Sequence, residues 1–166
     1  MLLHTAWENY VEQVAVEGLE AVLAWAASDD SRLHSAMRQK LGALKDPWAL
    51  AGSGWQKQAR VAVLADAGRL NTPNVANSEA LLDLAIGLPE ALHGVSWQGI
   101  RSARVLERID TFVHDIRGEI VHKGTVPGPL NKGGVESWIN FFESLVPRVD
   151  DKLASHLATV TGTAPW

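Results

Sequence analysis

The chain has 166 residues, which is enough for one hydrophobic core and too few for two ordinary domains. Hydrophobic residues make up 46% and charged residues 20%, without a low-complexity run, so the composition is that of a folded globular protein rather than a disordered one. The absence of cysteine excludes disulfide frameworks, thiolate metal sites and a cysteine nucleophile. We expect a single domain spanning residues 1–166.

The net charge of −4 argues against a protein that coats nucleic acid through charge alone. Segment 101–132 is nevertheless locally basic, with six Lys and Arg against four Asp and Glu. No apolar stretch reaches the roughly 18 residues that a membrane-spanning helix needs. The first residues also lack the pattern of a secretory signal. We therefore expect a cytoplasmic protein with no membrane partner.

Apolar residues recur at intervals of three and four along most of the chain, and no segment shows the period of two that marks strands. Helices are predicted at about 3–27, 33–45, 55–67, 78–88, 96–122 and 135–158. In the first of them the buried stripe is expected to include Trp7, Val11, Val14, Leu19 and Val22. We therefore predict an all-α fold, an antiparallel four-helix bundle with short additional helices between long helices two and three.

The helix predicted at 96–122 ends on the one stretch that offers evident chemistry. Arg117 and His122 lie five residues apart there. An imidazole can exchange protons near neutrality, and a guanidinium stays charged and binds phosphate through two N–H groups. On an ideal helix five residues turn about 500°, so these side chains project about 140° apart. The two side chains could still reach one phosphodiester in either of two ways. The last turn could depart from ideal geometry near Gly124, or a second copy of the chain could place its own motif opposite across a twofold axis.

An arginine followed after four residues by a histidine, at the end of a late helix of an all-α bundle, resembles the signature of HEPN domains (higher eukaryotes and prokaryotes nucleotide-binding). The likeness extends over most of the chain, to Trp7-Glu8-Asn9-Tyr10, Asn71-Thr72-Pro73-Asn74, Gly87-Leu88-Pro89 and Trp97. This succession is similar to the RiboL-PSP and MAE-type branches of the family. The resemblance implies a homodimeric endoribonuclease that needs no metal or cofactor. It also implies a toxin–antitoxin or phage-defence setting, with an antitoxin or regulatory protein as a possible partner.

In the chemistry that the resemblance implies, an RNA 2′-hydroxyl attacks the adjacent phosphate and leaves a 2′,3′-cyclic phosphate and a 5′-hydroxyl. His122 matches the histidine that transfers protons, and Arg117 matches the arginine that holds the phosphate. The family usually has a polar residue directly after the arginine, where this chain has Gly118. A glycine cannot orient the imidazole one turn away, but it leaves space beside His122 for a phosphate or a partner chain.

Further residues are candidates for supporting roles. Glu8 could hydrogen-bond the motif arginine, or could simply be a solvated acid beside core aromatics. His114 shares a helix face with Arg117 and could join the cleft, or could be only a partly buried polar residue. Three polar residues flank the motif and could contact an RNA backbone, or merely solvate a loop: Lys123, Asn131 and Lys132.

A basic ridge on the motif helix is a weaker candidate for phosphate binding, since Glu107 and Asp110 could neutralise its arginines, Arg101, Arg104 and Arg108. The sequence has no His-Glu-x-x-His motif, no phosphate-binding glycine loop and no serine-hydrolase elbow. We therefore expect no metal site and no cofactor. The alternative to a ribonuclease is a non-catalytic HEPN-like module that dimerises or binds a nucleotide, RNA or a partner protein.

Overall fold

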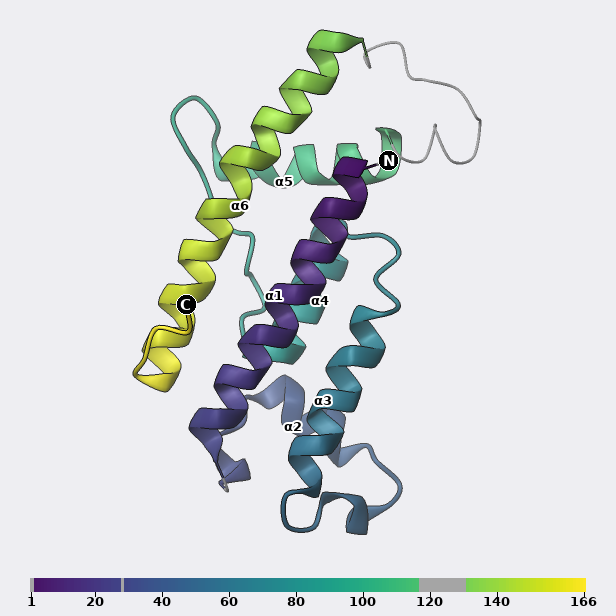
Figure 1. The fold of residues 1–166 in the computed structure, drawn as a ribbon, viewed down its shortest axis with the longest axis vertical. Helices are drawn as coiled ribbons and strands as arrows, with labels where there is room; N and C mark the ends of the chain where they lie inside the picture. Colours follow the sequence, from purple (N-terminus) through teal and green to yellow (C-terminus); the bar gives the residue numbers. More distant parts are fainter. Residues whose placement is uncertain (1, 28, 117–130) are drawn as a thin grey trace.

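The computed structural model describes residues 2–27, 29–116 and 131–166, and all of its regular elements are helical (Figure 1). The α-helices are α1 (Leu2–Ala26), α2 (Ser35–Gly42), α3 (Gly54–Ala67), α4 (Val75–Ile86), α5 (Ser102–Thr111) and α6 (Lys132–Thr161). Two 3₁₀ turns, η1 (Asp30–Arg32) and η2 (Pro47–Leu50), flank α2, and a π-helical turn, η3 (Phe112–Ile116), extends α5. The prediction of an all-α fold whose helices pack against one another is confirmed.

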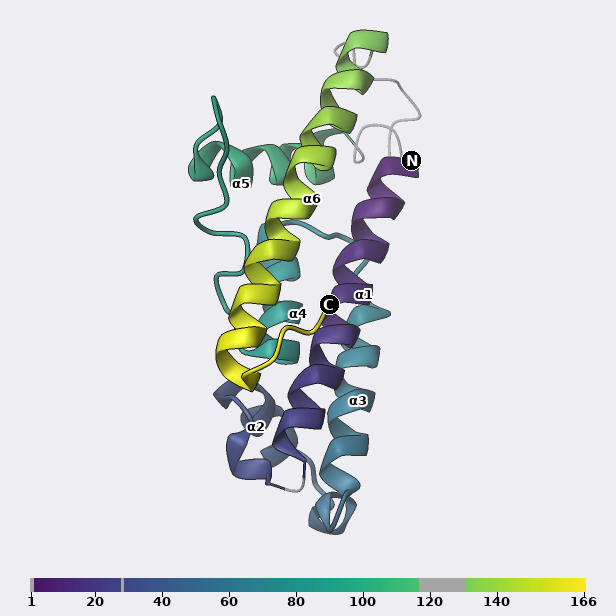
Figure 2. The ribbon, with the colours of Figure 1, turned by 60° about the vertical axis from the view of Figure 1, so that its left-hand side comes forward.

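Helix α1 is the centre of the bundle and packs against α3, α4 and α6. These four helices follow the long axis of the molecule, whereas α5 crosses it near one end and α2 lies near the other (Figures 1 and 2). We had expected the segments at 33–45 and 96–122 to be bundle members, and the segments that became α3 and α4 to be accessory. The roles are exchanged because α2 is short and buries only Met37 and Leu41, whereas α4 buries most of its length.

Helices α1, α4 and α6 run in the same direction, and α3 runs opposite to them (Figure 1). Trp7 packs on Phe142 with ring centroids 5.5 Å apart. Further along α1, Gly18 approaches Ile86 and Leu157, and a Cβ atom added at Gly18 would lie 2.6 Å from the Ile86 side chain. These directions differ from the antiparallel arrangement that we expected, because the chain returns from the end of α4 through a long connector rather than through a helix.

That connector, residues 87–101, is held by polar contacts from α4 and α6. Glu79 of α4 is 8% exposed, and its Oε1 accepts hydrogen bonds from the Leu92 backbone N–H and from Nδ1 of His93, both at 2.9 Å. From α6, Lys152 donates to the carbonyls of Glu90 and His93. Burial lowers the pKa of the Lys152 ammonium. The connector is therefore held between α4 and α6, and His93 takes part in holding it.

The substitution Glu79→Ala is expected to lower the free energy of unfolding by about 1–3 kcal/mol, because the Leu92 N–H is left buried without its acceptor. Glu79→Gln keeps an acceptor oxygen and should lose clearly less. His93→Ala is the matched control, because it leaves the bond between Glu79 and Leu92 intact. Urea unfolding followed by circular dichroism measures all three, and equal losses in Glu79→Ala and His93→Ala would contradict the role assigned to the carboxylate.

The helix that leads to the motif begins at Ser102, not near Ser96 as predicted. The backbone N–H groups of Trp97 and Ile100 each bond the other residue's carbonyl, at 3.1 and 2.9 Å, which closes a tight turn. Within that turn Gly99 has a φ of 86°, a conformation that favours glycine and interrupts a helix. The predicted helix is therefore shortened at its start, and its described part ends at Ile116.

Candidate functional site

The two residues expected to perform chemistry, Arg117 and His122, lie outside the described residues, as do Gly118 and Lys123. The helix that leads to them is described as far as Ile116, the residue directly before Arg117. The site can therefore be built from the surroundings of that helix end, where three other predicted features meet: the first turns of α1, the loop at 71–74, and His114.

The helix end itself is irregular. Its last five described residues form the π-helical turn η3, in which Phe112 and Val113 are buried while His114 and Asp115 are exposed. Single π-helical turns place one extra residue in a helix and occur often at functional sites. The chain thus presents a histidine at its surface shortly before the motif arginine.

The ring of His114 is oriented by the start of α4. Oδ1 of Asn74 accepts a hydrogen bond from the Asn77 backbone N–H at 2.8 Å and so caps α4. Because Oδ1 of Asn74 makes this cap, the other atom of the amide, Nδ2, is the one that contacts Nε2 of His114, at 3.1 Å. An amide nitrogen can only donate, so Nε2 accepts and the ring proton is assigned to Nδ1. Asn74 therefore fixes the orientation of the His114 ring beside the start of α4.

The loop at 71–74 joins α1 to the motif helix. The Trp7 indole N–H donates to the carbonyl of Pro73 at 2.8 Å, in a buried position. From α5, the carboxylate of Asp110 accepts from the Val75 backbone N–H at 2.9 Å. With the Asn74 contact, this makes a continuous set of hydrogen bonds from α1 through the loop to η3. Segments that are far apart in the sequence, and that carry the resemblance, are thus in direct contact.

Glu8 lies beside the same helix end. Its carboxylate is 3.3 Å from Nδ1 of the buried His4, whose ring stacks against Phe112 of η3 at 6.4 Å between centroids. Burial, followed by the charge of Glu8 one turn earlier, raises the pKa of Glu12. Within the described chain Glu8 therefore acts on the motif helix through His4, and its expected bond to the motif arginine involves a residue outside the described ranges.

Of the aromatic residues beside Glu8, Trp7 belongs to the core and Tyr10 packs against its edge. Trp7 is 1% exposed, and the two rings stack at 5.6 Å. Tyr10 is only partly buried, and its hydroxyl donates to the Asp150 carboxylate at 3.0 Å. Burial and that neighbouring charge raise the pKa of the Tyr10 phenol, which is therefore held as a neutral donor between α1 and α6.

The residues predicted to flank the motif on its far side, Asn131 and Lys132, have local structural partners. Oδ1 of Asn131 accepts from the Gly134 backbone N–H at 3.0 Å and caps α6. Lys132 is highly exposed, with its ammonium 3.9 Å from the Glu136 carboxylate, a pair that contributes little in water. Of these two residues, only Lys132 presents a charged group to solvent, and that group lies within ion-pair distance of Glu136.

The arginines of the predicted basic ridge differ in their surroundings, and Arg101 is exposed directly before α5. Arg104 pairs with Glu107 at 2.6 Å, while Asp110, expected to neutralise the ridge, instead binds the start of α4. The Arg108 guanidinium lies over the rings of Trp138 and Phe141, at 4.7 and 4.6 Å from their centroids. Local sequence patterns do not predict this aromatic environment, because it joins side chains about 30 positions apart.

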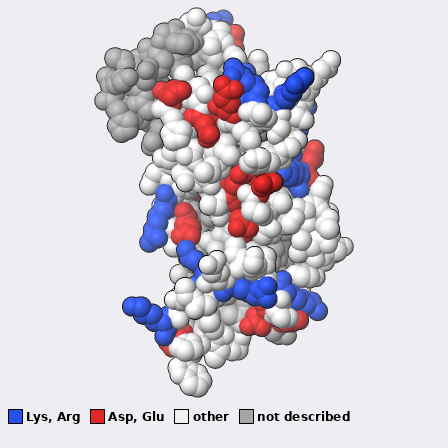
Figure 3. Space-filling model, turned by 180° about the vertical axis from the view of Figure 1, so that it is seen from behind, with Lys and Arg blue, Asp and Glu red and all other residues white. Residues whose placement is uncertain are grey.

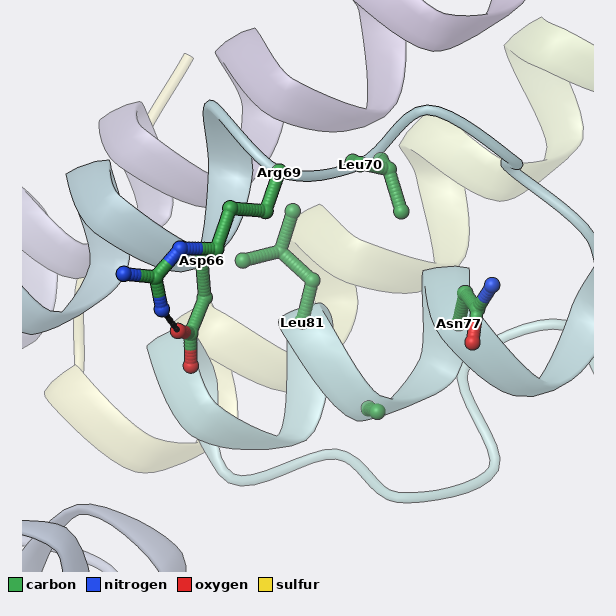
Figure 4. Close-up of a pocket in the computed structure, with 6 residues that line it drawn as sticks. Asp66, Arg69, Leu70, Asn77 and Leu81 are labelled. Atoms are coloured by element: carbon green, nitrogen blue, oxygen red, sulfur yellow. Dashed lines mark ion pairs between the residues drawn. The ribbon is translucent and has the colours of Figure 1, made fainter.

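A surface pocket lies between the end of α3 and the start of α4 (Figure 4). It has a volume of about 280 Å³ and combines leucine side chains with Asp66, Arg69 and Asn77. Asp66 is already paired with Lys40 at 2.8 Å and approaches Arg69 at 3.9 Å. The charged groups that line this pocket are thus paired with other side chains, and we do not regard the pocket as a candidate catalytic site.

Lys and Arg side chains are interspersed with Asp and Glu over the face shown in Figure 3, so charge alone marks no binding surface there. Among the described residues, no group of three or more His, Cys, Asp or Glu side chains is placed to hold a metal ion. Within the same ranges, no helix has the length and hydrophobicity needed to cross a membrane. No family model matches the chain, and neither a curated protein nor a solved structure is significantly similar to it.

Proposed function

We propose that this chain is a HEPN-like endoribonuclease that acts as a homodimer on RNA in the cytoplasm, without a metal ion. The supporting observation is the hydrogen-bonded connection from Trp7 through Pro73 and Asn74 to His114. Two of the segments on which the resemblance rests, at Trp7 and at 71–74, are distant in sequence but are brought together beside the helix that leads to Arg117. A chance match of a short motif would not require such contacts.

In the proposed reaction the RNA 2′-oxygen forms a bond to the adjacent phosphorus and the bond from phosphorus to the 5′-oxygen breaks. One histidine, His122 of one copy, takes the 2′-hydroxyl proton, and His122 of the other copy gives a proton to the departing 5′-oxygen. Arg117 binds the phosphate and stabilises the negative charge that develops on it. Two copies are required because a single motif holds only one such histidine.

His114 and Glu8 support this site in the proposal. His114 is exposed and its ring is oriented by Asn74. Because the resemblance gives proton transfer to His122, His114 is assigned a contact with the RNA. Glu8 stabilises the helix end through His4 and Phe112. A ribonuclease of this kind needs restraint in the cell, which is consistent with a toxin–antitoxin or phage-defence role and an inhibitory partner protein.

The test is incubation of the purified protein with a single-stranded RNA in excess EDTA. We expect cleavage, with products that end in a 2′,3′-cyclic phosphate and a 5′-hydroxyl, as mass spectrometry can establish. A DNA strand of the same sequence lacks the attacking hydroxyl and should remain intact. RNA that stays intact in EDTA, or products with other end groups, would contradict the proposal.

A second candidate function is a non-catalytic HEPN-like module that binds RNA or a nucleotide. The observation that favours it is Arg108 of α5, a half-buried arginine that lies over two aromatic rings and lines a groove. Binding without cleavage in the assay above would select this function over the ribonuclease.

A further inference from the structure

A groove lies between α5, the turn at 97–100 and the first turns of α6. It has a volume of about 420 Å³. Its lining is mixed, with aromatic rings, hydroxyl and amide groups and one arginine: Trp97, Arg108, Ser137, Asn140, Phe141 and Ser144 line most of it. None of these residues belongs to the motif or to its predicted supporting set. The groove is therefore a feature that the proposed reaction leaves unexplained.

Arg108 is the cation of this groove. Its guanidinium is half-buried in the corner formed by the rings of Trp138 and Phe141, which are nearly perpendicular at 89°. The one hydrogen bond that it makes to a described residue is long, 3.4 Å to the hydroxyl of Ser137, and no described carboxylate pairs with it. Burial and the neighbouring charge of Arg104 lower the pKa of Arg108, yet a guanidinium stays protonated at neutral pH. A charged fork with spare N–H donors thus faces the groove.

The other lining groups suit a nucleotide. Trp97 is half-buried and packs against Phe141 at 5.6 Å between centroids, so part of its ring lies in the groove. Bases stack on such rings irrespective of sequence. Ser137 and Asn140 are exposed and can exchange hydrogen bonds with a ribose hydroxyl or a base edge. The acidic lining residue, Glu136, has the Lys132 ammonium 3.9 Å from its carboxylate, which offsets its charge.

We propose that this groove binds single-stranded RNA, with a backbone phosphate on Arg108 and a base against Trp97. The choice of RNA rests on the proposed function. The choice of a phosphate rests on Arg108, which has no carboxylate partner among the described residues. The groove lies on the same helix that leads to Arg117, but it contains none of the residues assigned to the cleavage step. It would therefore contribute to affinity rather than to the chemical step.

The experiment is fluorescence anisotropy with a short labelled single-stranded RNA whose riboses are all 2′-O-methylated, so that no cleavage can occur. Arg108→Gln removes the charge and should weaken binding about tenfold and flatten its dependence on salt. Arg104→Gln, on the same helix but paired with Glu107, is the matched control and should change binding less than about twofold. Asn140→Asp places a negative charge on an exposed position of the groove and should also weaken binding, without disturbing the rings beneath Arg108.

Circular dichroism melting confirms that each variant is folded. Loss of binding in Arg108→Gln and Asn140→Asp, with Arg104→Gln unchanged, supports the groove. Three results would overturn the groove proposal. The wild type could fail to bind the RNA, both groove variants could bind as well as the wild type, or Arg104→Gln could weaken binding as much as the groove variants do. The two proposals can fail separately. If cleavage depends on His122 but RNA binding does not depend on Arg108, only the groove proposal is contradicted. If binding depends on Arg108 but RNA is not cleaved, only the ribonuclease proposal is contradicted.

Discussion

The substitution His122→Ala is expected to reduce RNA cleavage by about 10²–10⁴-fold, the range that a positioned proton-transfer group contributes. The proposed reaction uses this imidazole twice, once in each copy, so no other group in the motif can replace it. Arg117→Ala should have a comparable effect, because the charge that develops on the phosphate then has no partner. Rates are measured with a labelled RNA in EDTA, and gel filtration should show the same oligomeric state for variants and wild type.

Two further histidines serve as comparisons for that experiment. His93→Ala is the matched control, because His93 lies on the connector and contacts Glu79, and it should leave the cleavage rate unchanged. His114→Ala should reduce cleavage only a few-fold, because His114 is assigned a contact with RNA rather than proton transfer. Cleavage that survived His122→Ala but disappeared in His114→Ala would move proton transfer to the residue that Asn74 orients, and would contradict the assignment to His122.

The buried face of α1 could be predicted because it depends on local periodicity alone. Trp7, Val11 and Val22 repeat at helical spacing, and all three are buried as predicted. The start of α4 was predicted less well, since Asn74, Asn77 and Ser78 can each cap a helix. Asn74 is the cap, and Ser78 is instead fully buried on the face of the helix. Sequence indicates that a cap is present nearby, but tertiary packing decides which residue serves.

Neither the helix directions nor the groove could be predicted from local patterns. The parallel course of α1 and α6 follows from the path of the connector, which is set by contacts such as Glu79 with Leu92. The environment of Arg108 depends on Trp138, which is brought beside it only when α6 packs over α5. The motif at Arg117 and His122 was found from residue type and spacing, and its role in catalysis stays a prediction until the variants are assayed.

The link between Trp7 and Pro73 has the largest expected effect on stability. Trp7→Ala should lower the free energy of unfolding by about 3–5 kcal/mol, because it removes a fully buried ring that packs on Tyr10 and Phe142. Since whole domains are stable by only about 5–15 kcal/mol, this variant should be close to unfolding. Urea unfolding followed by tryptophan fluorescence or circular dichroism measures the loss.

Trp7→Phe separates the hydrogen bond from the packing. It keeps an aromatic ring but leaves the buried carbonyl of Pro73 without its donor, which costs about 1–3 kcal/mol. Because that loop also carries Asn74, hydrogen exchange at the amides of Val75 and Asn77 should accelerate more than exchange elsewhere in α4. Trp25→Phe, on the same helix but only half-buried, is the control and should leave these amides protected. If the amides of Val75 and Asn77 are equally protected in both variants, the loop at 71–74 is held in place without the Trp7 hydrogen bond. The contact between Trp7 and Pro73 would then no longer support the proposed function.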